Sequence, residues 1–433
     1  MNAKRRLLLL GALAAPVAYL AAKRPRRTGG GHNAHFQQLQ GALREAGLHR
    51  PTLVIDKQQL AHNLGRLKAN LPKNKHFRIV AKSLPSLPLI REVRAAMGTD
   101  RLMVFHQPHL NLIAREMPDA QMLLGKPMPA GAARRFYAEL KPANSRGKFD
   151  GQRQVEWLID TGVRMAEYRE LAAAQPKGAL RLNLELDVGL HRGGFRTARE
   201  VAEVVRMIAS EPRLEFSGFM GYEAHASKIP DALGGPRGAL KKAMTFYGEC
   251  VTAAREALGE RFKPEHLTLN AGGSNTYELY DESAPCNELA IGSALVKPTD
   301  FDTKALADHQ PACFIATPVL KALDRTVLPG LEMASGLLAA WDPNSARTFY
   351  LYGGYWLASP VSPPGLQRNA IWGHSTNQDM LNGSSEVQLG VDDFVFLRPH
   401  QSESVFLQFG DLAVYDQGRI TAAWPVFPEG TTS

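Results

Sequence analysis

The chain has 433 residues, of which 44% are hydrophobic, so it can bury a large core over roughly two domains. The formal charge is +9, but seven of the 51 basic residues lie in the first 27 positions and the remainder of the chain carries about +2. Because those remaining charges are mixed in sign, they argue against a nucleic-acid-binding surface. The three cysteines show no CxxC spacing, which argues against a disulfide framework or a thiolate zinc site.

The N-terminal segment predicts export or a membrane anchor. Arg5 and Arg6 precede an apolar stretch over residues 7–22, which fits the core of a secretory signal better than a full membrane span. The arginine pair resembles the twin-arginine export signal. We therefore expect residues 1–32 to be a targeting segment plus a glycine-containing linker, on a periplasmic or inner-membrane-anchored protein. A basic tail on a cytoplasmic protein is the alternative.

Short apolar runs alternate with helix-like segments over the next part of the chain. The runs lie at residues 51–56, 77–82, 101–106, 120–126, 154–160, 180–189, 214–223, 266–273 and 287–296. Segments between them carry apolar residues at three- and four-residue spacing, which indicates amphipathic helices. With the first run set aside, eight strands remain, which predicts a (β/α)8 TIM-type barrel over residues 57–305. An open doubly wound sheet is disfavoured because no GxGxxG follows an early strand.

The pattern of apolar and polar residues changes beyond about residue 305. Helix-like patterns fade, and strand-like runs separated by Gly, Pro, Asn and Asp turns follow. Residues 306–433 are therefore predicted to form a second, all-β domain, which makes the fold class α/β with a C-terminal β domain.

Lys82 ends the first strand of the predicted barrel. A lysine at the end of a buried strand is costly to desolvate, so a chemical role is one explanation for it. A lysine amine forms Schiff bases with carbonyls, and pyridoxal phosphate is a common cofactor that uses one. The alternative is a lysine that extends its amine into solvent from a strand end.

Polar residues mark the strand at 180–189. Asn183, Glu185 and Asp187 alternate with leucines, so the polar set should point into the barrel, because helices cover its outer face. The turn after this strand carries His191 and Arg192. Arg192 can pair with a carboxylate, a phenolate or a phosphate oxygen, or remain a solvated turn residue.

The next two strands end in further polar residues. The motif GYEAH places Tyr222 and His225 at the same end of the barrel, either in a site or in a hydrogen-bonded corner. The following strand ends in a turn whose backbone amides can approach an anion, at the position where barrels commonly bind phosphate. This turn contains Gly272, Gly273, Ser274 and Asn275.

Histidines in the β domain are candidate metal ligands. His400 is followed two residues later by Ser402, and His374 lies in another predicted loop. A borderline metal requires more than one strong donor, and serine is a poor ligand when neutral. Polar turn histidines are the alternative.

Taken together, these motifs resemble the fold-type III family of pyridoxal-phosphate enzymes, which contains the alanine racemase N-terminal barrel. Within it they are similar to the branch of D-threonine aldolase and D-serine dehydratase. The resemblance extends from about residue 35 onward and depends on the order of AK at 81–82, LDVGLHRGG, GYEAH, AGGSNTY, NELAIGS and a late PHxS. It implies a homodimer whose subunits close each other's sites, and a segment at 33–56 that packs with the β domain.

The resemblance also implies roles for individual residues. Lys82 would form the Schiff base with pyridoxal 5'-phosphate, Tyr222 would face the pyridine nitrogen, and Arg192 would lie beside the phenolic oxygen. The phosphate would be held by the turn at Gly272, Gly273, Ser274 and Asn275. His400 would bind a divalent metal, Mn or Zn, but this chain has Ser402 where the family pattern has Cys or Asp.

The implied activity is that of a lyase acting on D-amino acids, with retro-aldol cleavage of β-hydroxy substrates favoured because Ser402 weakens the metal site. His191, His225 and Lys82 are the candidate bases. D-serine dehydratase and racemase are the enzymatic alternatives. A non-catalytic pyridoxal-phosphate-binding protein, or a membrane-tethered binding protein without the cofactor, would be of a different class.

Overall fold

The computed structural model describes residues 23–140, 149–175, 178–327, 330, 332, 341–369 and 372–428. The predicted targeting stretch at residues 7–22 lies outside the described residues. The chain divides into two compact units: one contains residues 1–54, 314–399 and 415–422, and the other contains residues 55–313, 400–414 and 423–433.

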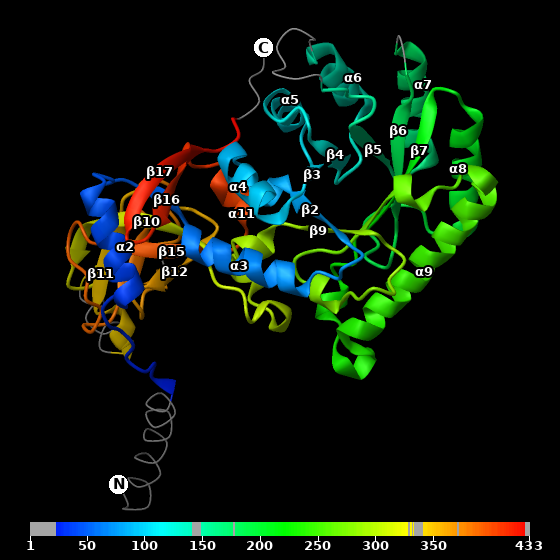
Figure 1. Ribbon diagram of the computed structural model, residues 1–433. Helices are drawn as coiled ribbons and strands as arrows, with labels where there is room; N and C mark the ends of the chain where they lie inside the picture. The colour runs from blue at the N-terminus through cyan, green and yellow to red at the C-terminus, as the bar shows by residue number, and fades with distance from the viewer. Residues whose placement is uncertain are drawn as a thin grey trace, which may run out of the picture. The chain divides into compact units, whose positions relative to one another are not determined.

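The larger unit contains a closed barrel of eight parallel strands, which confirms the predicted fold class (Figure 1). The strands pair in chain order, and the last pairs with the first. They are β2 (His76–Val80), β3 (Arg101–Val104), β4 (Gln121–Leu124), β5 (Val155–Ile159), β6 (Leu180–Leu186), β7 (Leu214–Gly221), β8 (Thr268–Ala271) and β9 (Glu288–Ile291).

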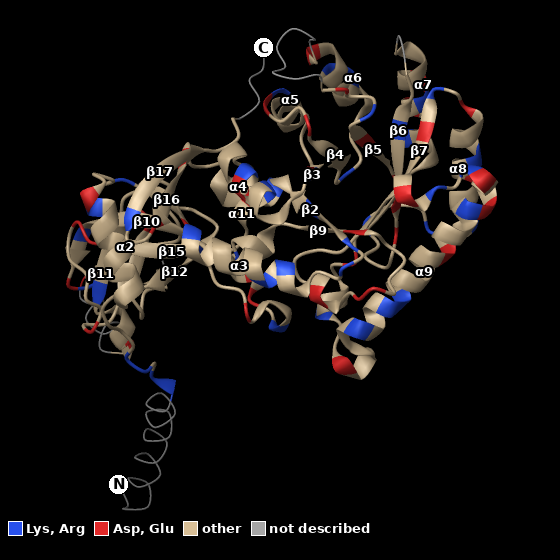
Figure 2. Ribbon diagram, in the orientation of Figure 1, with Lys and Arg blue, Asp and Glu red and all other residues tan. Residues whose placement is uncertain are grey.

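Helices lie outside the barrel between successive strands up to β8 (Figure 1). From β8 to β9 the chain forms only a short 3-10 turn at Tyr277–Leu279. The helices of this unit are α3 (Lys57–Asn70), α4 (Leu87–Met97), α5 (Gln107–Glu116), α6 (Ala130–Glu139), α7 (Gly162–Ala174), α8 (Ala198–Ser210), α9 (Gly235–Leu258) and α11 (Ser402–Phe406). Figure 2 shows basic and acidic residues interspersed along α8 and α9.

Local sequence explains where these helices begin and end. Helix α8 starts with a capping box, in which Thr197 accepts from the backbone N–H of Glu200 and the Glu200 side chain accepts from the backbone of Thr197. Its buried face contains Val201, Val205 and Ile208 at helical spacing. Helix α4 ends at Gly98, whose φ of 62° is the left-handed conformation that glycine adopts without steric cost.

In the part of the chain that the structure describes, the smaller unit contains a nine-stranded sheet and the helix α2 (Ala34–Glu45). The sheet order is β13-β14-β11-β10-β1-β16-β17, and β15 pairs with β10 and β12. The Phe36 ring on α2 contacts those of Phe314 and Phe396. The strands are β1 (Thr52–Asp56), β10 (Cys313–Leu323), β11 (Arg347–Leu351), β12 (Ala358–Ser362), β13 (Gln367–Arg368), β14 (Met380–Gly383), β15 (Phe394–Pro399), β16 (Asp411–Asp416) and β17 (Arg419–Pro425).

Among the helices that the structure describes, none combines the length and apolar character needed to cross a membrane. Export or membrane attachment through residues 1–32 therefore stays a prediction from the sequence.

Charged groups fill the interior of the barrel. Arg78 on β2 is 1% exposed and donates through Nε and Nη2 to the two oxygens of Glu288 on β9, at 2.5 and 3.0 Å. Glu288 also accepts from Asn270 of β8 and from Arg101 of β3. Burial raises the pKa of Glu288, but the two guanidinium groups outweigh burial and hold it below that of an ordinary glutamate. This pair therefore links the first and last strands of the barrel.

A second polar cluster occupies the interior near β5 and β6. Asn183 donates to Glu156 at 3.2 Å and to the backbone carbonyl of Thr268 at 3.1 Å. The Thr268 hydroxyl donates to Glu156 at 2.7 Å. The prediction that Asn183 points into the barrel is therefore confirmed.

Replacing Glu288 tests the barrel pair. Glu288→Gln should lower the free energy of unfolding by about 3 kcal/mol at pH 7, because it leaves Arg78 buried without a carboxylate. Because the pKa of Glu288 is depressed, its contribution is complete above the ordinary glutamate pKa and is lost as pH falls through the folded-state value. Urea denaturation measures both effects. Glu203→Gln, which breaks the exposed pair with Arg199, should change stability by less than about 0.5 kcal/mol.

The C-terminal segment of this unit is anchored beside α5. Phe427 is 2% exposed, its backbone N–H donates to the carbonyl of Pro85 at 2.7 Å, and its ring centroid lies 4.6 Å from that of His109. Burial, with a smaller effect of His106, lowers the pKa of His109 to about 4. The neutral imidazole is therefore the form that packs against Phe427.

Acidification should weaken this anchor. The pKa of His109 is lower in the folded than in the unfolded protein, so its stabilising contribution is complete above about pH 6.5 and is lost as pH falls toward 4. Between pH 7 and pH 5, we expect the wild type to lose about 1 kcal/mol more stability than His109→Phe, after allowance for partial solvent exposure. Equal losses in urea denaturation at the two pH values would contradict this assignment.

Candidate active site

A cavity of about 540 Å³ lies at the carboxyl ends of the barrel strands. Its lining includes side chains from the turns after all eight barrel strands, which is where (β/α)8 barrels place their sites. Among the charged and polar ones are Lys82, Lys126, Arg192, Tyr222, Ser274 and Ser293. Glu403 from α11 joins them, although it lies 321 residues beyond Lys82 in the chain.

Lys82 lies just beyond its strand. β2 ends at Val80, and residues 81–83 form a 3-10 turn that directs the Lys82 amine into the cavity. Nζ of Lys82 lies 3.2 Å from Oε1 of Glu403 and 4.8 Å from the centroid of the Phe105 ring. The Lys82 side chain is 45% exposed, so the amine is accessible to a ligand in the cavity.

The turns after β8 and β9 approach each other closely. Gly272 has a φ of 80°, and a Cβ on Gly273 would lie 2.8 Å from Cε2 of Tyr222. The backbone N–H groups of Gly292 and Ala294 donate to Oγ of Ser274, at 3.4 and 3.0 Å. The absence of a side chain at Gly273 therefore leaves backbone open to the cavity beside the Tyr222 ring.

A buried carboxylate holds the β8 turn in place. Glu223 is 0% exposed, accepts from the backbone N–H of Gly272 at 3.2 Å and accepts from the Thr276 hydroxyl at 2.5 Å. Burial raises the pKa of this carboxyl, opposed by hydrogen bonds from the Thr276 hydroxyl and the backbone N–H of Gly272. The sequence reasoning singled out Tyr222 and His225 but missed Glu223. The feature of the sequence that could have indicated Glu223 is a glutamate at the end of the apolar run at residues 214–223.

Two further predicted residues, Arg192 and Tyr222, do meet in the cavity. The Arg192 guanidinium lies 5.3 Å from the centroid of the Tyr222 ring, a cation–π distance. Glu185, predicted to face the barrel interior, is 8% exposed and lines the same cavity. Burial raises the pKa of Glu185, and the nearby Arg192 opposes this effect.

The structure places the two candidate histidine bases and Asn275 outside the cavity lining. His191 has a φ of 56°, its side chain is 78% exposed, and Nδ1 lies 3.1 Å from Oδ2 of Asp187. His225 lies against Gly189, where an added Cβ would be 2.9 Å from the imidazole Nε2. Asn275 accepts a hydrogen bond from Thr303 at 3.1 Å. A role for these three residues in the site therefore stays a prediction.

The predicted metal ligands do not assemble a site. Across the described ranges, no group of three or more His, Cys, Asp or Glu residues could hold a metal ion. Ser402 is 0% exposed on α11, and its hydroxyl has no hydrogen-bond partner. His374 lies in the other unit, where Nδ1 is 2.7 Å from Nη1 of Arg368. The ligand set suggested for a divalent metal at His400 and Ser402 therefore does not fit the residues present.

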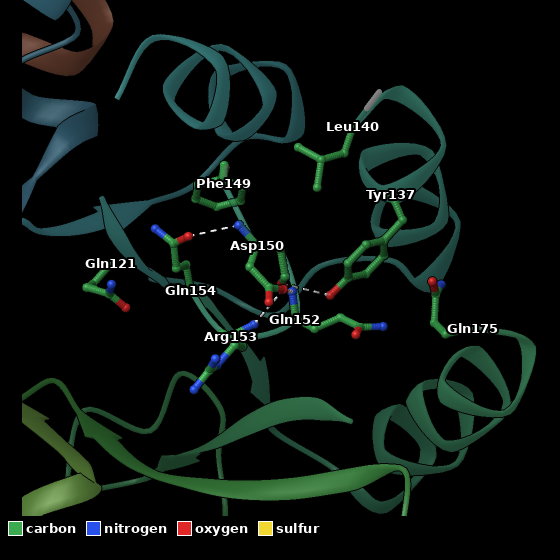
Figure 3. A pocket seen from close by; sticks show the side chains of 10 residues that line it. Gln121, Tyr137, Leu140, Phe149, Asp150, Gln152, Arg153, Gln154 and Gln175 are labelled. Carbon is green, nitrogen blue, oxygen red and sulfur yellow. Dashed lines mark hydrogen bonds between the residues drawn. The ribbon is translucent and has the colours of Figure 1, made fainter. Parts of the chain in front are cut away.

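A second cavity, of about 880 Å³, lies at the amino ends of β4 and β5 (Figure 3). Its lining includes Tyr137, Gln152 and Gln154, and the Gln154 amide oxygen accepts from the backbone N–H of Asp150 at 2.8 Å. It lies at the opposite end of the strands from Lys82. The candidate residues Lys82, Arg192, Tyr222 and Ser274 line the first cavity.

Comparison with known sequences identifies the barrel. Residues 55–300 match the model of the alanine racemase N-terminal domain. The chain is also 27% identical over 190 residues to the alanine racemase of Levilactobacillus brevis, a match that covers 43% of this chain and spans about half (47%) of that racemase.

Solved structures share the fold across both units. A D-threonine aldolase from Filomicrobium marinum superposes with a TM-score of 0.65 at 14% identity, over 87% of this chain and 95% of that one. D-threo-3-hydroxyaspartate dehydratase from Delftia sp. HT23 gives 0.63 at 15% identity, over 88% and 98%. Alanine racemase from Bacillus anthracis gives 0.63 at 13% identity, over 87% and 98%. Because the family model covers more than half of the chain, the protein belongs to the family of the alanine racemase N-terminal domain.

Proposed function

We propose that this protein is a pyridoxal-phosphate-dependent lyase that cleaves β-hydroxy-D-amino acids into glycine and an aldehyde. The observation that carries the proposal is the meeting of the Lys82 amine with the open turn at residues 272–274 in one cavity at the carboxyl ends of the barrel. Membership of a family of fold-type III pyridoxal-phosphate enzymes supports it.

The residues present fit the cofactor. A primary amine is available to the cofactor's aldehyde at Lys82. The β8 turn offers backbone that only glycine leaves uncovered, as the 2.8 Å approach of an added Cβ to Tyr222 shows, and such turns suit a phosphate. Arg192 and Tyr222 would lie beside the ring, and Gly273, Ser274 and Ser293 would hold the phosphate.

The protein's own groups would position the substrate and move its protons. When bound, pyridoxal phosphate supplies the electron withdrawal that weakens bonds to the substrate's α carbon. Phe105, Met103 and Met220 give the cavity apolar walls that exclude water. Lys126 is a cation in the lining that would attract the substrate carboxylate. Lys82 is the group placed to exchange a proton with the α carbon.

Racemisation is the second candidate, because the sequence match to an alanine racemase lies in the barrel. A racemase delivers and removes protons on opposite faces of the α carbon. Here the two proton-carrying groups that touch each other, Lys82 and Glu403, are 3.2 Å apart and therefore on one side of an incoming amine. This pair could take up and return a hydroxyl proton, as bond cleavage requires. Dehydration with a metal's help is less favoured, because Ser402, a poor ligand when neutral, stands where the family pattern has Cys or Asp.

Cofactor binding and the reaction can be tested together. Purified wild type should show an absorbance band of a lysine-bound cofactor after incubation with pyridoxal phosphate, and borohydride should fix the cofactor on Lys82 in the peptide map. Lys82→Ala should lose the fixed label and lower glycine formation from D-threonine by at least about a thousandfold, since no other group replaces the nucleophile.

Product analysis separates the alternatives. Glycine and acetaldehyde from D-threonine support the lyase, whereas L-alanine from D-alanine without glycine from D-threonine would show a racemase. Wild type with no cofactor band would refute the proposal altogether, and so would a lysine other than Lys82 carrying the label.

Glu223 should control cofactor affinity without touching the cofactor. Glu223→Gln replaces one acceptor oxygen with a donor, so the hydrogen bonds from Gly272 and Thr276 cannot both persist. We expect the dissociation constant of pyridoxal phosphate to rise about tenfold, which corresponds to about 1.4 kcal/mol. Fluorescence titration measures it. Glu256→Gln, on the exposed face of α9, is the control; equal affinities in all three proteins would contradict the role assigned to Glu223.

A further inference from the structure

One carboxylate reaches the reactive amine of the site. Glu403 is the first-turn residue of α11, its side chain is 25% exposed, and Oε1 lies 3.2 Å from Nζ of Lys82. The cavity lining contains two other carboxylates, Asp160 and Glu185. Asp160 accepts a hydrogen bond from the Thr161 hydroxyl, and Glu185 interacts electrostatically with the Arg192 cation. Neither carboxylate is therefore the partner that the structure gives Lys82.

Neighbouring hydroxyls fix the orientation of this carboxylate. Ser83 donates through Oγ to the same Oε1 of Glu403 at 3.2 Å, and Ser293 donates to Ser83 at 3.0 Å. Ser83 is 2% exposed and Ser293 is 3% exposed, so this chain of hydrogen bonds is shielded from water. The carboxylate is therefore held toward the amine by the β2 turn as well as by its own helix.

We propose that Glu403 is the second catalytic acid–base residue of this site and that it forms a proton-recycling pair with Lys82. This inference rests on the proposed lyase function and names the group that receives the substrate's hydroxyl proton. The substrate's amino group must come to the position of the Lys82 amine, so a carboxylate 3.2 Å from that nitrogen faces the atoms next to it. The α carbon is bonded to that nitrogen, and the carbon that bears the hydroxyl is bonded in turn to the α carbon.

The protons and electrons balance without an external reagent. Glu403 takes the proton of the β-hydroxyl, and the electron pair of that O–H bond becomes the second bond of the aldehyde carbonyl. The Cα–Cβ bond breaks, and its electron pair stays with the α carbon. Lys82 gives a proton to that carbon, which completes glycine. Glu403 then returns its proton to Lys82 across 3.2 Å, and both groups are ready for another turnover.

The ion pair itself can be examined before any cofactor is added. In the full chain freed of pyridoxal phosphate, acetylation of Lys82 by a small active ester at pH 7 should be about threefold to tenfold faster in Glu403→Gln than in wild type. Without the carboxylate 3.2 Å away, the amine is no longer held in that contact and is free to attack the ester. Asp160→Asn removes one negative charge from the same cavity but not from Lys82, so its rate should stay within about twofold of wild type. Equal rates in wild type and Glu403→Gln would overturn the pairing.

The catalytic role has a separate readout in the loaded enzyme. Glu403→Gln should keep the cofactor band and lose about a hundredfold in glycine formation from D-threonine, the usual effect of removing a general base. Exchange of the α proton of glycine in deuterium oxide needs only Lys82 and should change less than about threefold. Glu403→Asp keeps a carboxylate and should recover part of the cleavage rate.

The outcomes distinguish this inference from the proposed function. If wild type cleaves D-threonine and Glu403→Gln cleaves it within about threefold, Glu403 is not the base and the lyase proposal stands. If wild type binds the cofactor but forms no glycine, the lyase proposal fails, and the hydroxyl role of Glu403 fails with it. Loss of the cofactor band in Glu403→Gln would make Glu403 a cofactor-binding residue and overturn its catalytic role.

Discussion

The buried pair of Arg78 and Glu288 is the interaction on which the site depends, because it joins the first and last strands of the barrel. Both side chains are at most 1% exposed, and their bidentate contact spans β2 and β9. Two charges in a barrel interior are costly unless their hydrogen bonds are satisfied, and here Asn270 and Arg101 provide further partners. The turn that carries Lys82 follows β2, and the turn that carries Ser293 follows β9. The geometry of the cavity therefore depends on charges buried below it.

The turn after β8 is likewise held by a buried charged group. Glu223 is buried and is not among the residues that line the cavity. It couples the end of β7 to the turn after β8 through Gly272 and Thr276. Its neighbour Tyr222 lines the cavity. Tyr222 thus forms part of the cavity wall, while the adjacent Glu223 supports the turn at residues 272–274.

The barrel could be predicted because its signal is local. Each apolar run before a helical segment indicates one strand, and parallel closure brings the strand ends together without any knowledge of side-chain contacts. Lys82, Arg192, Tyr222 and Ser274 were found in this way and do line one cavity. His191 and His225 follow strands too, but sequence spacing does not report where a turn side chain points. The positive φ of His191 and its pairing with Asp187 leave that side chain 78% exposed.

Glu403 was beyond such reasoning because it comes from a distant part of the chain. Glu403 belongs to a stretch that groups with the barrel in one compact unit, although it follows the barrel strands by more than a hundred residues. The family resemblance drew attention to Ser402, one residue earlier. Successive residues on a helix point about 100° apart, so on α11 the burial of Ser402 and the projection of Glu403 into the cavity are consequences of one helical orientation. The motif thus located the correct segment, and helix geometry decides which of its side chains meets Lys82.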